Sequence, residues 1–467
     1  MRNFSFGRMC WLAAFSIVGG ITTAIGAQPA HSSSVIDLFS DVSAWKASAP
    51  FNLEGMKLEA VHEPNQALRL KILSHGSQRD VGGWVRSLPP FEAGKRYRME
   101  VMFVAEGIES PQRHIWALVT SGSRELQEFQ TVEDKGDRYR LALEFTPVKD
   151  FKDCDLRLYL AKTVRGAVTW EKATWEDITV RYKPRRAHVA AISGRPKNPA
   201  SSKEAVEFYA GKLDQVAGLG IDLVCLPENI NTDEVVGDRW EMIEPIPGPT
   251  TERLAEKARQ HNVYIAASIA ERDGNARYNT AVLIDRQGAI VAKYRKTHLT
   301  VSEQLLSGIT AGSEFVVHEA DFGKVGLMVC FDHHFPEVPR ILALKGAEVL
   351  VMPNAADGRE KGALWESAMR MRAVDNHVYI VSAVNFGRSL VAAPDGNILA
   401  ENERSSIEPG GLVHAVCEIG DSVANHTGQP INKRYLQLRR PEIYQALLHD
   451  LDGDLKGRVG DAPSRTP

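Results

Sequence analysis

The hydrophobic pattern changes its period near residue 183, and this change limits the possible folds more than any other feature of the chain. Before it, apolar residues alternate with polar ones, at 68–72, 97–103, 139–145 and 156–160. Such alternation is typical of half-buried antiparallel strands. After it, buried strand patterns alternate with helical patterns, at 189–192, 203–218, 223–226, 251–261 and 263–268. The sequence therefore predicts an all-β region followed by a layered α/β region.

The all-β region is predicted to be an antiparallel β-sandwich whose last strand covers 175–182. It holds five tryptophans: Trp45, Trp84, Trp116, Trp170 and Trp175. Packing in the core is the favoured interpretation, because large aromatic side chains are mostly buried. A second hypothesis is a glycan-binding surface, because the region resembles the jelly-roll carbohydrate-binding modules attached to secreted enzymes. That resemblance concerns architecture and includes no specific motif.

The first residues have the pattern of a secretory signal peptide. Arg2 and Arg8 precede an apolar run at 11–18, and small residues follow up to Ala27. This order of charged, apolar and small residues predicts a leader over 1–27 and an exported mature protein. No later apolar run is long enough to span a bilayer, so we expect no stable membrane span. The predicted organisation is then a sandwich domain over 28–185, an α/β domain over 186–450 and a polar tail over 451–467.

Charge and cysteine content exclude several functions. The net charge of −3 argues against a nucleic-acid partner, because such binding relies on neutralising phosphates. Cys10 leaves with the leader, and the four remaining cysteines are too few for a disulfide framework: Cys154, Cys225, Cys330 and Cys417. The chain contains neither a C-x-x-C pair nor an H-E-x-x-H motif, so no metal site is predicted. It also lacks the G-x-S-x-G elbow of serine hydrolases.

One cysteine stands where a strand is predicted to end. The apolar run 325–329 leads directly into Cys330, and polar residues and Pro336 follow. A strand end holds a side chain rigidly while the turn exposes it, which suits a nucleophile. The alternative is a core cysteine, as predicted for Cys225 and Cys417 within apolar runs.

Two more polar groups follow predicted strands, and together with Cys330 they reveal a family. Glu228 stands in Leu-Pro-Glu after a buried strand, and Lys296 stands in Tyr-Arg-Lys-Thr-His-Leu after a hairpin. Cys-Phe-Asp and Phe-Pro-Glu then follow in that order. The region 187–447 thereby resembles the carbon–nitrogen hydrolase, or nitrilase, superfamily. The resemblance implies a four-layer αββα sandwich fold and a homodimer.

The resemblance also implies how the site works, with no metal or organic cofactor. Cys330 would be the nucleophile, Glu228 the general base and then acid, and Lys296 the cation that stabilises the oxyanion. The backbone N–H of Phe331 would assist Lys296. Glu303 resembles the family's supporting carboxylate. The substrate would be a small amide, hydrolysed through an acyl-thioester.

Two neighbouring residues depart from the family pattern. His333 and His334 stand where many amidase-type members carry an aliphatic residue and then an arginine. We therefore assign no carboxylate-bearing substrate and expect the two histidines to support the site or contact substrate. Three alternatives remain open: a nitrilase, an N-acyltransferase with the same triad, and a non-catalytic glycan-binding protein.

Overall fold

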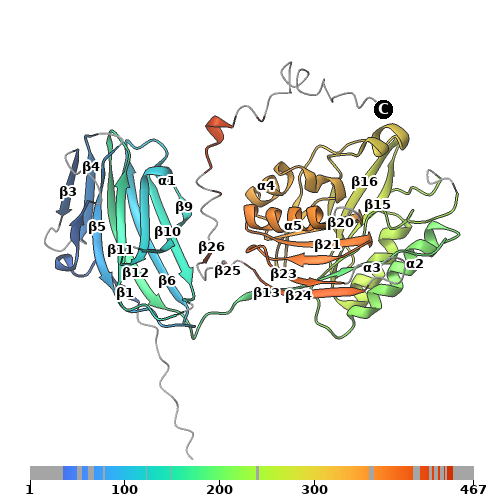
Figure 1. The fold of residues 1–467 in the computed structure, drawn as a ribbon, viewed down its shortest axis with the longest axis horizontal. Helices are drawn as coiled ribbons and strands as arrows, with labels where there is room; N and C mark the ends of the chain where they lie inside the picture. Colours follow the sequence, from blue (N-terminus) through green and yellow to red (C-terminus); the bar gives the residue numbers. More distant parts are fainter. Residues whose placement is uncertain are drawn as a thin grey trace, which may run out of the picture.

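The computed structural model describes most of the chain between residues 35 and 447 (Figure 1). The described residues are 35–49, 55–61, 68–76, 79–122, 124–147, 149–237, 241–356, 362–402, 411–419, 423–424, 430–431, 436, 439–444 and 447. The predicted leader over 1–27 and the predicted tail over 451–467 lie outside this set.

The first region consists of two antiparallel sheets. One has the order β3-β4-β12-β6-β10-β9, with β1 added on β12, and the other has the order β2-β5-β11-β7-β8. The strands of the first sheet are β1 Ile36–Asp37, β3 Met56–Val61, β4 Arg69–Ser74, β6 Tyr97–Glu106, β9 Gln130–Asp134, β10 Arg138–Phe145 and β12 Gly166–Asp177. Those of the second are β2 Lys46–Ser48, β5 Val81–Leu88, β7 Ile115–Ser121, β8 Arg124–Glu128 and β11 Cys154–Ala161, with the one-turn helix α1 at Pro111–His114.

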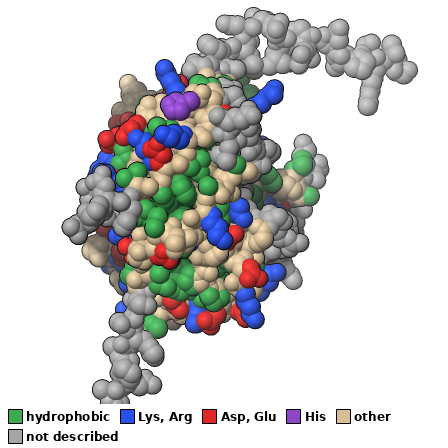
Figure 2. Space-filling view, turned by 90° about the vertical axis from the view of Figure 1, so that its left-hand side faces the viewer, with side chains coloured by type: hydrophobic (Ala, Val, Ile, Leu, Met, Phe, Trp, Pro, Cys, Tyr) green, Lys and Arg blue, Asp and Glu red, His purple; other side chains and the backbone are tan. Residues whose placement is uncertain are grey.

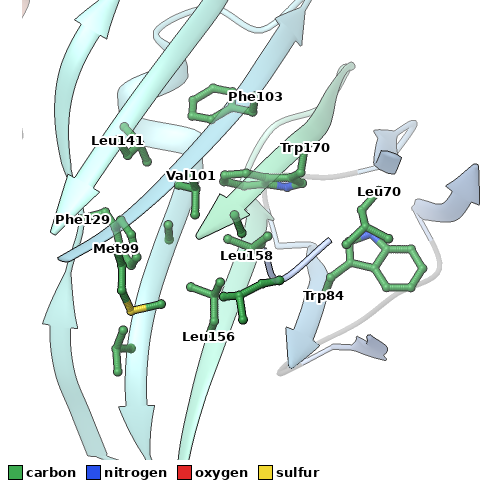
Figure 3. Close-up of a cluster of buried hydrophobic side chains, with 14 of the residues drawn as sticks. Leu70, Trp84, Met99, Val101, Phe103, Phe129, Leu141, Leu156, Leu158 and Trp170 are labelled. Carbon is green, nitrogen blue, oxygen red and sulfur yellow. The ribbon is translucent and has the colours of Figure 1, made fainter. Parts of the chain in front are cut away.

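The alternation in the sequence produces one apolar face on each of these sheets. In β6 every second residue from Tyr97 to Ala105 is buried, which places five side chains on one face. The apolar faces of the two sheets meet in a shared core (Figure 3). Trp170 of one sheet and Trp84 of the other both lie in that core, as Figure 3 shows.

The tryptophans divide into core residues and half-buried ones. Trp45, Trp84 and Trp170 are buried, which confirms the packing interpretation for these three. Trp175 is half-buried against the same core, whereas Trp116 packs with Val81 and Tyr159 outside it. The strand predicted over 175–182 is wrong in its second half. β12 ends at Asp177, and 178–181 form a turn in which the N–H groups of Arg181 and Tyr182 both bond the carbonyl of Ile178.

The second region is built on two six-stranded sheets. The first has the order β17-β16-β15-β14-β13-β24, with strands β13 Arg185–Ile192, β14 Leu223–Cys225, β15 Tyr264–Asp273, β16 Ala276–Ile284, β17 Ile290–Arg295 and β24 Leu412–Ile419. The second has the order β18-β19-β20-β21-β22-β23, with strands β18 Val317–Ala320, β19 Gly323–Leu327, β20 Val349–Ala356, β21 Tyr379–Phe386, β22 Leu390–Ala392 and β23 Ile398–Glu401. The helices are α2 Ser202–Lys212, α3 Pro249–His261, α4 Glu337–Leu344 and α5 Gly362–Asn376. A short pair, β25 Val423–Ala424 and β26 Pro430–Ile431, follows.

Each six-stranded sheet is buried on both faces. One face of each sheet contributes to a common core, which contains Cys225 of β14 and Cys417 of β24. The opposite face of the first sheet packs on α2 and α3, and that of the second packs on α4 and α5. The continuous apolar runs in the sequence reflect this two-sided burial. Cys225 and Cys417 are core residues, as predicted.

The basic residues at the junction between the regions belong partly to a strand. β13 begins at Arg185, which the sequence pattern assigned to the end of the sandwich domain. Arg185 pairs with Glu348 at 2.6 Å, and Arg186 pairs with Glu418 at 3.3 Å. Both arginines therefore belong to β13 and form ion pairs with residues of the α/β region.

The surface includes an apolar area. Figure 2 shows hydrophobic side chains gathered on the face that lies to the left in Figure 1, between basic and acidic side chains. Among the described residues, none of the helices combines the length and the hydropathy required to cross a bilayer.

Candidate active site

Cys330 lies at a sharp turn directly beyond a buried strand. β19 ends at Leu327, and Cys330 opens the 3-10 turn η4, which covers Cys330–His334. Its φ of +43° places it in the left-handed region, which a residue with a Cβ adopts at a cost of about 1–2 kcal/mol. Surrounding contacts must hold this conformation, and a strained, rigid turn of this kind is typical of a functional residue.

Asp332 holds the turn in place. Its side chain is fully buried, and five donors converge on it. Oδ2 accepts from the Tyr294 hydroxyl at 2.7 Å and from the Val329 N–H at 2.9 Å. Oδ1 accepts from the His298 N–H and Nδ1 at 3.1 Å each and from Thr297 Oγ1 at 3.2 Å. This carboxylate therefore ties the turn to the segment that follows β17.

Lys296 is the first residue after β17, and it is held between two carboxylates. Nζ lies 2.9 Å from Glu228 Oε1 and 2.9 and 3.0 Å from the two carboxylate oxygens of Glu303. The side chain is 1 % exposed. Burial lowers the pKa of Lys296, but the carboxylate charges of Glu228 and Glu303 outweigh it and raise the pKa above its ordinary value. Lys296 is therefore an ammonium ion at neutral pH.

The Glu228 carboxylate lies close enough to the Cys330 thiol for its charge to act on the pKa of that thiol. Glu228 follows β14 and is buried, so a residue of one six-stranded sheet acts on a residue that follows a strand of the other. Burial of the thiol and the charge of Glu228 raise the pKa of Cys330 above its ordinary value, although Lys296 and the Ala355 N–H oppose them. Cys330 is therefore a thiol at neutral pH, and the Glu228 carboxylate is placed to accept its proton.

Glu303 supports the lysine from a short π-helical turn, η3, at Ser302–Leu306. Its Oε2 accepts from the Thr300 N–H at 2.8 Å and from Thr300 Oγ1 at 3.0 Å. Burial raises the pKa of Glu303, but the Lys296 charge and these bonds lower it below its usual range overall. The structure thus places Lys296 in contact with Glu228 and Glu303, with Cys330 near enough to interact with Glu228 and Lys296.

Asn279 is a site residue that the sequence interpretation did not single out. Its Nδ2 donates to Glu228 Oε1 at 2.7 Å and to Glu303 Oε1 at 3.0 Å, while its Oδ1 accepts from Ser268 Oγ at 2.7 Å. The amide thereby fixes the spacing of the two carboxylates. An asparagine inside the apolar strand 276–284 was the available signal, because a buried amide needs partners.

The two adjacent histidines occupy different environments. His333 is buried, and its Nδ1 lies 2.6 Å from the carbonyl oxygen of Cys330. His334 is exposed, with its ring 4.9 Å from that of Phe331. Their ring centroids are 4.0 Å apart, and the ring planes are tilted by 35° to each other. Among the residues that the structure describes, no three His, Cys, Asp or Glu side chains gather in a way that could hold a metal ion.

Comparison with known proteins identifies the family. The carbon–nitrogen hydrolase family model matches residues 188–413. An omega-amidase, NIT2 of Homo sapiens, is 34 % identical over 207 residues, which cover 40 % of this chain and 75 % of that protein. The chain belongs to the carbon–nitrogen hydrolase family. A nitrilase of Pyrococcus abyssi (strain GE5 / Orsay) is 38 % identical over 217 residues, covering 42 % of this chain and 78 % of its own.

Solved structures of the same kind are also similar. A carbon–nitrogen hydrolase from Helicobacter pylori G27 is 22 % identical with a TM-score of 0.49, covering 57 % of this chain and 99 % of its own. An amidase from Nesterenkonia sp. is 22 % identical with a TM-score of 0.48, covering 57 % and 98 %. The predicted enzyme class, an amidase-like carbon–nitrogen hydrolase, is confirmed by the family membership.

Proposed function

We propose that this enzyme hydrolyses a small carboxamide to a carboxylic acid and ammonia or an amine, through an acyl-thioester on Cys330. One observation carries the proposal. The Lys296 ammonium is fixed between Glu228 and Glu303 at 2.9 Å from each, and the charges of Glu228 and Lys296 both act on the Cys330 thiol. Nucleophile, base and oxyanion cation are thus all side chains of this chain.

The reaction follows from these contacts. Glu228 accepts the thiol proton as Cys330 Sγ bonds to the carbonyl carbon, and the carbonyl oxygen becomes an oxyanion. Lys296 and the Phe331 N–H stabilise that oxyanion. When the intermediate collapses, the C–N bond breaks and Glu228 donates the proton to the leaving nitrogen. Glu228 then takes a proton from water, the hydroxide adds to the thioester, and the acid leaves as the thiol is restored.

Proton transfer must accompany the attack. Because burial and the charge of Glu228 raise the pKa of Cys330, the free enzyme holds a neutral thiol at neutral pH. The thiolate then forms only as the sulfur attacks the carbonyl carbon of a bound substrate. This protects the thiol from oxidation between turnovers, since the thiolate is the reactive form.

We also propose the wider architecture and setting. The two six-stranded sheets with outer helices correspond to the four-layer αββα fold, and the preceding pair of antiparallel sheets corresponds to a jelly-roll sandwich. The pattern of residues 1–27 supports export, and the family resemblance supports a homodimer. Half-buried Trp116 and Trp175 are the tryptophans left for a glycan. Binding of soluble glycans to the intact enzyme, measured by calorimetry, tests this last point.

A nitrilase is the second candidate, because the Pyrococcus abyssi relative is named as one. The same triad would add Cys330 to a nitrile carbon, and hydrolysis to the acid would release ammonia. An amide and a nitrile that share the same acyl part distinguish an amidase from a nitrilase. An amidase releases ammonia from the amide alone.

A panel of amides and nitriles, with ammonia release as the readout, tests the proposal. Intact-mass analysis of the quenched enzyme is expected to show an acyl adduct on Cys330. Cys330→Ala should abolish both adduct and ammonia. Cys417→Ala, the same change at a buried core cysteine, should retain both once folding is verified by circular dichroism. Absence of ammonia and adduct across a broad panel would refute the hydrolase function.

A further inference from the structure

The peptide unit between Cys330 and Phe331 is fixed by a side chain. His333 Nδ1 lies 2.6 Å from the Cys330 carbonyl oxygen. Because a carbonyl oxygen can only accept a hydrogen bond, Nδ1 carries the proton, and Nε2 of the neutral ring does not. The histidine that the sequence placed beside the nucleophile therefore faces its backbone.

Fixing this carbonyl also fixes the direction of the next N–H. A peptide unit is planar, and in the trans form its C=O and N–H point in opposite directions. The Phe331 N–H, the proposed second oxyanion donor, belongs to the same plane as the carbonyl held by His333. A rotation of that plane would turn the donor away from the acyl oxygen. The left-handed Cys330, with φ of +43°, makes such a rotation a real alternative, because its conformation is not a relaxed one.

His333 is itself held rigidly. It is 6 % exposed, and its own carbonyl accepts from Arg372 Nε at 3.2 Å, which links the turn to α5. Burial lowers the pKa of His333 to about 4, although the bond to Cys330 opposes this shift. At neutral pH the imidazole is therefore uncharged, and its single N–H is committed to the Cys330 carbonyl.

We propose that His333 is a positioning residue, which pins the Cys330–Phe331 peptide through Nδ1 and thereby aims the Phe331 N–H at the oxyanion. The inference rests on the proposed amide hydrolysis. The bond also polarises the peptide, because a carbonyl that accepts a hydrogen bond makes the N–H of the same unit a better donor. His333 contributes to the transition state through this backbone unit and need not contact the substrate.

Three variants of His333 test the role. His333→Leu removes the donor, His333→Asn puts an amide N–H where Nδ1 stands, and His333→Gln puts one nearer the position of Nε2. His414→Leu makes the same change at an exposed histidine on β24 and serves as the control. Complete removal of an oxyanion donor lowers kcat by about 10²–10³-fold, so a misdirected one should cost at least about tenfold.

Two readouts separate positioning from a structural role. For His333→Leu we expect kcat to fall at least about tenfold with KM within about threefold of wild type. Alkylation of Cys330 by iodoacetamide forms no oxyanion, so its rate should stay within about threefold. His333→Asn should recover most of kcat. His333→Gln should have the low kcat of His333→Leu. The control His414→Leu should have the kcat of the wild type.

Several results would overturn the inference. An unchanged kcat in His333→Leu would do so, as would an alkylation rate that falls together with kcat. If His333→Leu does not fold, an equal kcat in His333→Asn and His333→Gln would likewise overturn the inference. A wild-type enzyme that releases ammonia from no amide refutes the proposed function itself, whereas an active wild type with an equally active His333→Leu refutes positioning alone.

Discussion

Replacing Asp332 by Asn tests how the nucleophile turn is held. The side chain is fully buried and accepts five hydrogen bonds, two of them from the backbone N–H groups of Val329 and His298. These two groups face different carboxylate oxygens. In either orientation, an Asn side chain at this position must place its NH₂ group against one of these two backbone N–H groups. Unlike a hydroxyl or a histidine ring, a backbone N–H cannot become an acceptor.

The expected loss of stability follows from these contacts. One buried N–H without a partner costs about 1–3 kcal/mol, and bonds to a charged acceptor are each worth about 1 kcal/mol more than neutral ones. Together we expect the free energy of unfolding of Asp332→Asn to fall by about 3–5 kcal/mol. For a domain of this size, each kcal/mol lowers the melting temperature by about 2–4 °C.

Urea titration followed by circular dichroism, with thermal melting in parallel, measures the change. Asp395→Asn is the matched control, because Asp395 accepts only local bonds from Asn397 in an exposed turn. We expect less than about 1 kcal/mol there. A loss below about 1 kcal/mol in Asp332→Asn would contradict the idea that an acceptor-only side chain is required at the centre of this turn.

Three further predictions concern the thiols and the lysine. Glu303→Gln removes one of the two charges that hold Lys296, and kcat/KM should fall about 10²-fold in steady-state kinetics; an unchanged value would contradict a supporting role. Because burial and Glu228 raise the pKa of Cys330, the thiolate fraction grows with pH beyond the range of an ordinary thiol. The iodoacetamide rate constant should therefore keep rising to about pH 10, and a plateau near pH 8 would argue against the raised pKa. Cys154, Cys225 and Cys417 are buried and free, so dithiothreitol should leave the melting temperature of the enzyme unchanged, whereas a drop would indicate a disulfide.

Local patterns predicted most of the elements, and three motifs together, through the family they resemble, pointed to the candidate catalytic set. The alternation in 97–103 predicted the correct face of β6, because burial in an antiparallel sheet has the same period as the side chains. Glu228, Lys296 and Cys330 could be found because each stands in a motif directly beyond a strand. The position of Cys330 relative to the other two could not be predicted, because it depends on how two separate sheets pack.

Other features depend on contacts that no spacing encodes. Asn279 was overlooked because its role arises only where two carboxylates approach its amide. The sequence did not show that His333 would be buried against the Cys330 carbonyl while His334 stays exposed, because this depends on the packing around the turn. The turn at 178–181 was predicted as strand because its apolar residues continue the alternation of β12, while Ile178 instead accepts two backbone bonds there.

The division of the proposed catalytic residues between two sheets has a consequence for how the enzyme acquires activity. Glu228 and Lys296 follow strands of one sheet, and Cys330 follows a strand of the other. Neither sheet positions all three proposed catalytic residues, so we expect catalysis to begin only when the two sheets have packed together. During refolding, turnover should therefore appear with the last packing event and later than the recovery of secondary structure. Enzyme activity would therefore report whether the two six-stranded sheets have packed against each other.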